Sequence, residues 1–333
     1  MLAARDRKII VIAFIIFLFS QTLIFASIPR DTDPALRPVV IKSGTRLSEI
    51  AGLLKKEDLI YSKTLFMIGS VIYRGRLIAG EYDLRRDMST VDIIMKMGQG
   101  KRNIYTLKII EGHNIYTIAE TVDRSRIMTK DEFLKLALSK EFLKKIGITS
   151  ESLEGYLYPD TYFYSKEIDK EKFIERIARR TLKIFGDPEI KEKMALHNMD
   201  VHKTITLASM IEKESGANGE RPLVSAVFHN RLKRGMSFDC DPTVIYGTKG
   251  FGAPIRKIDL LTYTPYNTYS FKGYPAGPIC SPSKASILAA LNPAAVDYLY
   301  FVSKNDGTHV FSRDMVEHKK CVTMFQRNRT THQ

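Results

Sequence analysis

The sequence predicts an α+β protein made of an N-terminal transmembrane helix, a small α+β module and a larger α+β domain. Three observations support this prediction. Residues 9–28 contain no charged side chain and are mostly apolar. Downstream, short β-branched runs alternate with segments in which apolar residues recur at helical spacing. The 333 residues are enough for about two domains.

Composition and charge narrow the class of protein. Hydrophobic residues make up 44% of the chain and charged residues 26%, which excludes a disordered chain and a polytopic membrane protein. The 51 Lys and Arg outnumber the 37 Asp and Glu and give a net charge of +14. Such a charge favours polyanionic surroundings, namely nucleic acid, anionic lipid or an acidic wall polymer. Three cysteines, Cys240, Cys280 and Cys321, are too few for a disulfide framework, and their odd number leaves at least one thiol unpaired.

The apolar run at the N-terminus, residues 9–28, is predicted to be an uncleaved membrane anchor. Its 20 residues, at about 1.5 Å each, match a hydrocarbon core of about 30 Å. Basic residues precede the run, so the positive-inside rule places residues 1–8 in the cytoplasm and the chain beyond Arg30 outside it. The alternative is a cleaved signal peptide, which usually has a shorter apolar region and a small-residue cleavage pattern. Either location disfavours nucleic acid as a partner.

Residues 29–103 are predicted to form the small module. A strand over 39–41 is followed by a turn at Gly44 and by a helix that Thr45 caps. A similar strand, glycine and helix recur 68 residues later, with Gly112 in the turn, either as a repeat or by coincidence. Between the two segments we expect a helix over 63–73, a strand over 80–84 and a helix over 90–97 that ends at Gly98.

The larger domain, residues 104–333, contains several helices and one loop rich in tyrosine. The three tyrosines of the loop over 154–162 could stack on sugar rings or pack a domain junction. Helices are predicted over 130–145, 170–185 and 203–215, and Gly216 ends the last of these. Two further helices begin at Pro222 and at Pro282, the second with Ser281 as its cap. Residues 239–246 are predicted to form a loop and a strand, and residues 298–303 a strand.

The helix over 203–215 carries two carboxylates with different predicted orientations. Leu207, Met210 and Ile211 define its buried stripe, and Glu214 returns to within about 20° of that stripe. Glu212 lies about 140° away and is expected to be solvated. Burial would raise the pKa of the Glu214 carboxyl and keep it protonated near neutrality, as a general acid requires.

The alternative is a structural role for Glu214. An inward-facing glutamate is often paired with an arginine, and Arg221 and Arg231 are both available in the sequence. Removal of the charge separates the two possibilities, because it would abolish activity in the first case and lower stability in the second.

Polar side chains in the second half of the chain suit a polyhydroxylated substrate. Asn230 lies seven residues after Leu223, so it also faces the interior of its helix. The sequence contains no glycine-rich phosphate loop, G-x-S-x-G elbow or H-E-x-x-H pair. His318 and Cys321 have helical spacing but lack further ligands, so we expect neither a metal nor a cofactor.

Several separated motifs resemble the endolytic murein transglycosylase (YceG-like) family. They are EGYLYPDTY, LASMIEKES, ERPLVSAVFHNRL, DPTVIYG, YNTY and GYPAGPICSP, and they occur in that order. The resemblance covers nearly the whole chain. It implies a membrane anchor over 9–28, a LysM-like module over 29–103 and a transglycosylase catalytic domain over 104–333.

The resemblance also implies an activity and a set of site residues. Family members sit in the cell inner membrane and cut nascent peptidoglycan strands between N-acetylmuramic acid and N-acetylglucosamine, leaving a 1,6-anhydro-muramic acid end. The family's essential glutamate falls on Glu214 here. Peptidoglycan synthases, both polymerases and transpeptidases, are expected partners. The residues expected to contact substrate are Glu154, Tyr156, Asp160, Glu220, Asn230, Asp241, Tyr246, Asn267 and Tyr269.

Two other functions remain possible from the sequence. The protein could be a non-catalytic, anchored wall-binding protein in which the LysM-like module carries the function and Glu214 is structural. It could also be a muramidase-type hydrolase, which usually needs a second carboxylate. Asp241 and Glu220 are the candidates for that second carboxylate. Analysis of the cleaved ends distinguishes these possibilities.

Overall fold

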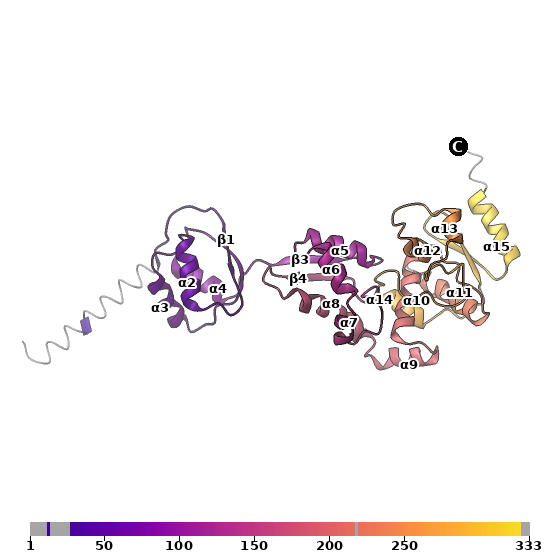
Figure 1. The fold of residues 1–333 in the computed structure, drawn as a ribbon, viewed down its shortest axis with the longest axis horizontal. Helices are drawn as coiled ribbons and strands as arrows, with labels where there is room; N and C mark the ends of the chain where they lie inside the picture. The colour runs from indigo at the N-terminus through magenta and orange to yellow at the C-terminus, as the bar shows by residue number, and fades with distance from the viewer. Residues whose placement is uncertain (1–11, 14–26, 217–218, 328–333) are drawn as a thin grey trace, which may run out of the picture. The chain divides into compact units, whose positions relative to one another are not determined.

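The computed structural model describes residues 12–13, 27–216 and 219–327, and the α+β class is confirmed (Figure 1). The chain divides into two compact units. Unit 1 holds the chain up to Thr106 together with Phe163–Asp169, and unit 2 holds Leu107–Tyr162 and the chain from Lys170 onward.

Most of the predicted anchor, residues 9–28, lies outside the residues that the structure describes. Within the described ranges, no helix has both the length and the apolar character needed to cross a membrane.

Unit 1 is a two-stranded sheet covered by three helices. Strands β1 (Arg37–Ile41) and β2 (Gly80–Leu84) are antiparallel, with Val39 opposite Tyr82. The helices α2 (Leu47–Lys56), α3 (Lys63–Tyr73) and α4 (Thr90–Gly98) bury their apolar stripes against this sheet. The core contains Ile50, Leu54, Phe66, Tyr82, Leu84, Ile93 and Met97.

The predicted cap of α2 is wrong by one residue. The N-cap is Arg46, whose backbone N–H donates to Glu49 Oε2 at 3.1 Å. The Thr45 hydroxyl donates instead to the carbonyl of Lys42 at 2.8 Å, so it closes the preceding turn and is not free to cap the helix.

The segment Phe163–Asp169 is tied to unit 1 through a buried carboxylate. The side chain of Glu81 is only 4% exposed and accepts Lys166 Nζ at 2.8 Å. Its second oxygen accepts the Tyr105 hydroxyl, also at 2.8 Å. This pairing holds a piece of chain from beyond residue 160 against a strand that ends at Leu84.

The spacing of 68 residues seen in the sequence recurs in the backbone. Strand β3 (Tyr105–Ile109) and helix α5 (Ile115–Arg124) begin and end 68 residues after β1 and α2. Gly44 and Gly112 occupy the two turns at φ of +84° and +78°, a region that favours glycine. Each strand pairs with one that follows the intervening helices, β1 with β2 and β3 with β4 (Asp160–Tyr164). The two segments are therefore alike in structure as well as in pattern.

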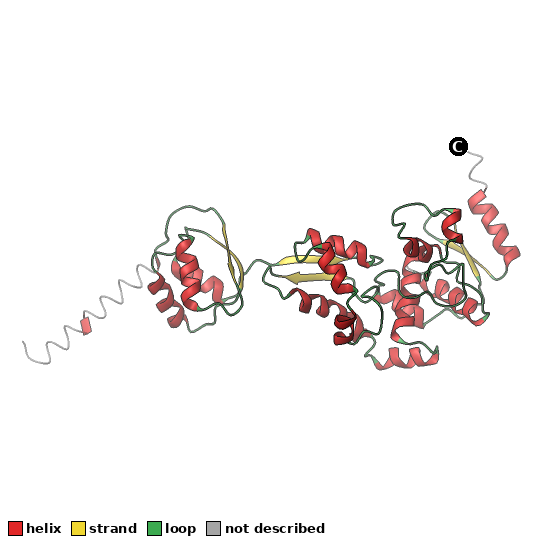
Figure 2. Ribbon diagram, viewed as in Figure 1, coloured by secondary structure: helices red, strands yellow, loops and turns green. Residues whose placement is uncertain are grey.

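Unit 2 is mostly helical, and its strands are short (Figure 2). One hairpin, β5 (Tyr300–Ser303) with β6 (His309–Ser312), is antiparallel and pairs Val302 with Val310. The remaining elements are α6 (Lys130–Ala137), α7 (Lys140–Ile146), α8 (Lys170–Ile184), α9 (Pro188–Leu196), α10 (Val201–Glu214), α11 (Arg221–Lys233), α12 (Asp241–Thr248), α13 (Lys257–Leu261), α14 (Lys284–Leu291), β5 (Tyr300–Ser303), β6 (His309–Ser312), α15 (Met315–Val322) and the π-helical turn η1 (Thr323–Arg327).

Helix α10 is the central element of unit 2. Its eight consecutive residues Thr204–Ile211 are all buried, and it packs against α14, α11 and α12. Three of these residues are polar, but each hydroxyl donates to a carbonyl of the preceding turn: Thr204 to Asp200, Thr206 to His202 and Ser209 to Thr206. The helix can therefore be buried on all sides and not only along one stripe.

Three predictions of element bounds in unit 2 are wrong. Residues 241–248 form helix α12 and not a strand, with Pro242 in its first turn, where a missing N–H costs nothing. The helix predicted to start at Pro282 begins at Lys284, because Ser283 and not Ser281 caps it. Helix α10 ends with Ser215 as its C-cap and not Gly216.

Candidate active site

Glu214 is the last residue of α10 and is partly exposed at the surface of unit 2. The pKa of Glu214 is raised to about 7, and the largest cause is the protein packed around its carboxyl. The nearby charge of Asp241 also raises this pKa, whereas a hydrogen bond from Cys240 and the charges of His309 and Arg231 lower it. The result is a carboxyl that is half protonated near neutrality and reachable from solvent.

The two arginines considered as partners of Glu214 bind other groups. Arg221 lies 3.6 Å from a carboxylate oxygen of Glu212. Arg231 pairs with Asp239 at 2.8 Å and donates to the carbonyls of Leu299 and Phe238. Neither arginine therefore neutralises Glu214 by direct contact.

Glu212 is not solvated, and the prediction made from its helical angle is wrong. Its side chain is 7% exposed, and Oε2 accepts the backbone N–H of Ser283 and the hydroxyls of Ser283 and Ser286 at 2.6–2.9 Å. Burial alone would raise the pKa of Glu212, but these hydrogen bonds and Arg221 outweigh it and lower the pKa. Glu212 thus holds the start of α14 against α10. The face of α10 that carries Glu212 is therefore covered by protein, in addition to the predicted stripe.

Cys240 precedes α12 and places a thiol on the Glu214 carboxyl. The side chain is buried, and its thiol hydrogen-bonds to Glu214. Burial and the neighbouring Glu214 raise the pKa of the Cys240 thiol well above its usual value, so the thiol stays protonated and acts as the donor. The next residue, Asp241, is exposed and accepts the Tyr269 hydroxyl at 2.6 Å.

The hairpin of β5 and β6 contributes a histidine to the surroundings of Glu214. Glu220 accepts the His309 backbone N–H at 2.8 Å and His309 Nδ1 at 2.7 Å, so both of its oxygens are used. The two side chains are about equally buried, at 12% and 13% exposure. The paired carboxylate and imidazole fix the hairpin beside the end of α10, close enough for the charge of His309 to lower the pKa of Glu214.

The sequence profile of the YceG-like family matches residues 39–324. The chain belongs to the YceG-like family. The resemblance inferred from the motifs is therefore confirmed.

Two relatives of this YceG-like chain carry the same name. An endolytic murein transglycosylase of Bacillus subtilis (strain 168) is 33% identical over 322 residues, which cover 91% of this chain and 88% of the relative. One from Streptococcus pneumoniae (strain R6) is 28% identical and covers 95% of this chain, but this chain spans only 65% of that relative's length. A crystal structure of a YceG-like protein from Listeria monocytogenes is 31% identical, covers 86% of this chain and 99% of the other, and superposes with a TM-score of 0.61.

Glu154 lies inside the YceG-like fold and not at its surface. Its side chain is fully buried and accepts the backbone N–H groups of Ile115 at 3.0 Å and Gly155 at 3.2 Å, as well as the Tyr246 hydroxyl. Burial raises the pKa of Glu154 to about 7. These contacts join α5, the loop over 154–162 and α12.

Three other residues predicted to contact substrate hold loops in place. Asn267 is fully buried, and its Nδ2 donates to the carbonyls of Leu260 and Thr262 at 2.9 and 2.7 Å. Asn230 Nδ2 donates to the carbonyls of Val296 and Tyr298, both at 2.9 Å. The buried Tyr156 hydroxyl contacts His202 Nδ1 at 3.2 Å.

The other residues predicted to contact substrate either hold parts of the structure together or lie toward Glu214. Asp160 pairs with Arg180 on α8. Tyr246 belongs to an aromatic cluster with Tyr116, Tyr266 and Phe251, whose ring centroids lie 4.7–6.4 Å apart. Of the nine residues predicted beside Glu214, the structure brings Asp241, Tyr269 and Glu220 toward it.

Two neighbours of Glu214, Cys240 and His309, were missed by sequence reasoning. Cys240 is adjacent to Asp241, and this adjacency was the only local signal. Nothing local indicates His309, because only the fold brings β6 to the end of α10. Within the described ranges, no group of three His, Cys, Asp or Glu side chains is arranged to hold a metal ion, and all three cysteines are free.

Proposed function

We propose that this lytic murein transglycosylase cuts peptidoglycan glycan strands internally, between N-acetylmuramic acid and N-acetylglucosamine, with Glu214 as its catalytic acid and base. One observation carries the proposal: the Glu214 carboxyl, at the solvent-reachable end of a buried helix, has a pKa raised to about 7. A group with this pKa can both donate and accept a proton near neutrality. The names of the curated relatives support the same activity.

The reaction needs a single carboxyl used twice. Protonated Glu214 donates its proton to the glycosidic oxygen, the bond to the muramic acid carbon breaks, and an oxocarbenium-like centre develops. The resulting carboxylate then removes the proton from the 6-hydroxyl of the same sugar. That oxygen attacks the cationic carbon and closes the 1,6-anhydro ring, so no water is added and Glu214 is protonated again.

Neighbouring groups support both roles of Glu214. The negative charge of Asp241 favours the protonated form before the bond breaks, and it can also stabilise a developing positive charge on the sugar. The Cys240 thiol and the charge of His309 favour the carboxylate that forms afterwards. The opposing influences keep the pKa near neutrality and away from either extreme.

A muramidase-type hydrolase is the second candidate, because Asp241 is exposed near Glu214 and could activate a water. The hydrolytic and anhydro products differ by one water molecule, so mass spectrometry distinguishes them. Full-length protein in detergent, incubated with purified glycan strands, should yield anhydro ends, and Glu214→Gln should yield about 10²–10⁴-fold fewer. Reducing ends from the wild type would favour the hydrolase, and no cleavage at all would favour a wall-binding protein.

The location and partners belong to the same proposal. The apolar run over 9–28 would anchor the protein in the inner membrane, with residues 29–103 as a LysM-like module outside the cytoplasm. There the enzyme would meet nascent strands beside the polymerases and transpeptidases and would end strand elongation. A reporter fused after Gln333 should be active only outside the cytoplasm, and a soluble mature form beginning near Pro29 would contradict the anchor.

A further inference from the structure

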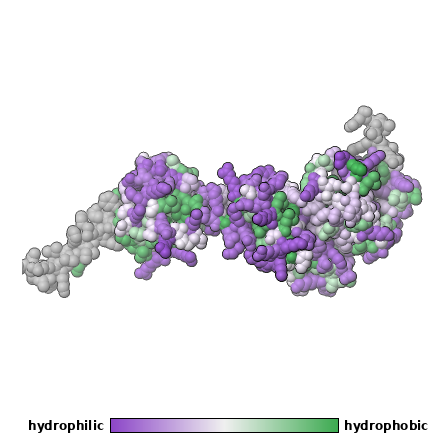
Figure 3. Space-filling model, viewed as in Figure 1, coloured by the Kyte–Doolittle hydropathy of each residue, from purple (hydrophilic) through white to green (hydrophobic). Residues whose placement is uncertain are grey.

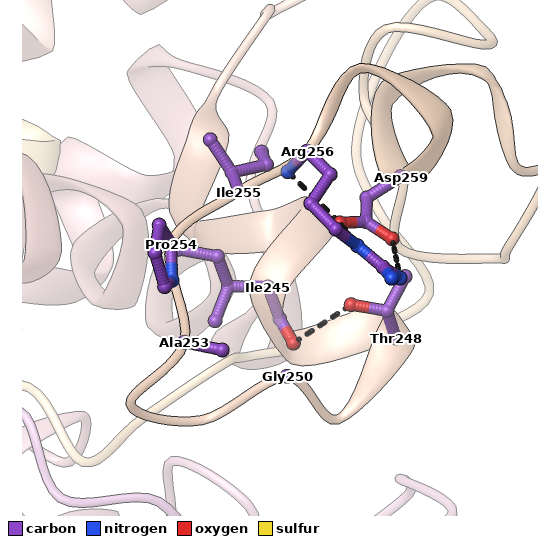
Figure 4. Close-up of a pocket in the computed structure, with 8 residues that line it drawn as sticks. All are labelled: Ile245, Thr248, Gly250, Ala253, Pro254, Ile255, Arg256 and Asp259. Atoms are coloured by element: carbon purple, nitrogen blue, oxygen red, sulfur yellow. Dashed lines mark hydrogen bonds and ion pairs between the residues drawn. The ribbon is translucent and has the colours of Figure 1, made fainter.

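A cavity of about 430 Å³ lies in unit 2 between the second half of α12, the loop that follows it, and α13 (Figure 4). Its size is within the range of small-ligand pockets. The close-up shows aliphatic side chains on one side and an arginine–aspartate pair on the other. The lining residues that matter here are Ile245, Thr248, Pro254, Ile255, Arg256 and Asp259.

The cavity shares one face of α12 with Asp241, the carboxylate whose charge acts on Glu214. Ile245 and Thr248 lie four and seven residues after Asp241, so all three side chains project from the same side of the helix. Asp241 is exposed and the other two are partly exposed. At 1.5 Å per residue, Thr248 is about 10 Å along the helix from Asp241. The cavity therefore lies about 10 Å or less along α12 from the carboxylate that neighbours Glu214.

Arg256 presents a fixed set of hydrogen-bond donors at the mouth of this cavity. Its Nε and Nη2 atoms donate to the two oxygens of Asp259 at 3.0 and 2.8 Å, and its backbone N–H donates to Asp259 at 2.9 Å. This arrangement uses two of the five guanidinium N–H groups and leaves three directed away from Asp259. The Arg256 side chain is 74% exposed, whereas Asp259 is 14% exposed, so a held guanidinium faces solvent.

The opposite wall selects for small apolar groups. Ile245, Pro254 and Ile255 supply aliphatic surface, and none of the eight lining residues is aromatic. Sugar rings bind preferentially to aromatic faces, whereas methyl and methylene groups suit an aliphatic wall. A ligand that combines a carboxylate with short aliphatic groups fits both sides of the cavity. In Figure 3 the surface around α12 is pale, which corresponds to residues of intermediate hydropathy.

The wall formed by α13 is connected to the catalytic region. Asn267 holds the end of α13 through the carbonyls of Leu260 and Thr262, and its Oδ1 accepts the backbone N–H of Tyr269 at 3.0 Å. The Tyr269 hydroxyl in turn donates to Asp241. One buried amide thus fixes the cavity wall relative to the carboxylate beside Glu214.

We propose that this cavity binds the acidic peptide stem that branches from the muramic acid residue next to the cleaved bond. The inference rests on the proposed function. An extended peptide advances about 3.5 Å per residue, so the second or third residue of a stem that starts beside Asp241, the neighbour of Glu214, spans the 10 Å or so along α12 to the cavity. The stem of peptidoglycan contains alanine methyl groups and free carboxylates, which match the aliphatic wall and the free edge of Arg256.

Two variants test the proposal by different routes. Arg256→Ala removes the guanidinium, and Ala253→Phe fills the cavity without changing any charge. The substrates are glycan strands of equal length, either carrying stem peptides or stripped of them by an amidase. The measured quantity is the preference, the ratio of kcat/KM for peptide-bearing over stripped strands. We expect wild type to prefer peptide-bearing strands and each variant to lower that preference about tenfold, as for one charge-assisted hydrogen bond.

Arg179→Ala is the matched control, because Arg179 is also an exposed arginine of unit 2 in an ion pair, with Glu175 at 2.7 Å. Its preference should equal that of wild type. The proposal would be overturned if both cavity variants kept the wild-type preference for peptide-bearing strands. It would also be overturned if Arg179→Ala lowered this preference as much as the cavity variants do.

A binding measurement separates failure of this proposal from failure of the proposed function. Calorimetric titration of full-length Glu214→Gln with a soluble muramyl tripeptide should show binding that Arg256→Ala weakens about tenfold. If the wild type forms no anhydro ends but this binding is found, the proposed reaction is wrong and the stem site stands. If anhydro ends form but Arg256→Ala leaves the tripeptide affinity unchanged, the stem site is wrong.

Discussion

The thiol of Cys240 donates a hydrogen bond to the carboxyl of Glu214. This contact joins the last residue of α10 to the residue that precedes α12. It acts against burial, because burial favours the protonated carboxyl while a hydrogen bond from a neutral thiol favours the carboxylate. Cys240 therefore both orients the proposed acid and limits the rise of its pKa.

Replacing Cys240 should move the pH dependence of catalysis. Cys240→Ala removes the donor, so the pKa of Glu214 should rise above its value of about 7. A hydrogen bond of this kind is worth up to about 1.4 kcal/mol, which corresponds to about one pH unit. In the pH profile of kcat, the descending limb should move to higher pH by up to that amount, and Cys240→Ser, which keeps a donor, should restore much of the wild-type limb.

Cys280→Ala is the control for this experiment. Cys280 is as deeply buried as Cys240, but its thiol donates to the carbonyl of Ser209 at 3.4 Å. Its removal should leave the limb of the pH profile in place. An equal displacement in Cys280→Ala would show that general loosening of the core, and not the lost donor, moves the profile.

The two glutamates of α10 should separate activity from stability. Glu214→Gln keeps the shape of the side chain but cannot donate a proton of suitable acidity, so cleavage should fall about 10²–10⁴-fold with the fold intact. Glu212→Gln should instead lower the free energy of unfolding by roughly 1–3 kcal/mol, because Ser283, Ser286 and Arg221 lose an anionic partner. Melting temperatures and yields of anhydro ends, measured side by side, check both expectations. A larger loss of activity in Glu212→Gln would reverse the assignment.

The stability of the wild type should depend on pH through Glu214. Its pKa of about 7 in the folded protein exceeds the ordinary glutamate value of 4.5, so the folded state binds the proton more tightly. Stability is therefore lost as pH rises from about 4.5 to 7 and changes little from this group above that range. Glu214→Gln removes the effect, so it should be roughly 1–3 kcal/mol more stable than wild type at pH 8 and equal to it at pH 4. Denaturant unfolding at the two pH values measures the difference, which would be absent if Glu214 ionised normally.

The pairing of Glu220 with His309 predicts a defined imidazole tautomer. In wild type, Nδ1 carries the proton that is donated to Glu220. Glu220→Gln keeps one acceptor oxygen for the backbone N–H of His309 and places an amide NH2 group against Nδ1, which favours the tautomer with the proton on Nε2. Nitrogen NMR of labelled histidine should show the Nδ1–H form of His309 in wild type and its loss in the variant, with a decrease in stability of about 1 kcal/mol. An unchanged spectrum would contradict the pairing.

Local pattern predicted most elements of unit 1 because each helix there has one buried stripe. The predicted helix over 63–73 and strand over 80–84 agree with α3 and β2. Helix α12 was missed because Thr243, Val244 and Ile245 are β-branched and favour strands in isolation. Burial of Thr243 and Val244 and the proline in the first turn decide for the helix. Tertiary packing thus overrode local preference in the helix whose second half lines the cavity.

The carboxylates of the site show how far angular reasoning extends. The raised pKa expected for Glu214 is found. The same reasoning failed for Glu212, because it allowed α10 only one buried stripe, whereas Thr206 and Ser209 are buried as well. Their hydroxyls bond to carbonyls within the helix, so α14 can cover that face as well. Cys240 and His309 lie beside Glu214 only because the tertiary fold places them there. The periodicity of the sequence carries no information about such contacts.

Because Phe163–Asp169 belongs to unit 1, the two units are not separated at one position in the sequence. The chain passes from one unit to the other three times, so no single point divides it into independent halves. A protease cut after Thr106 would leave Glu81 and its partner Lys166 on different fragments. Deletion of residues up to 103 would remove the surface against which the seven residues Phe163–Asp169 pack. Engineering that transplants or swaps the module therefore has to carry both segments together.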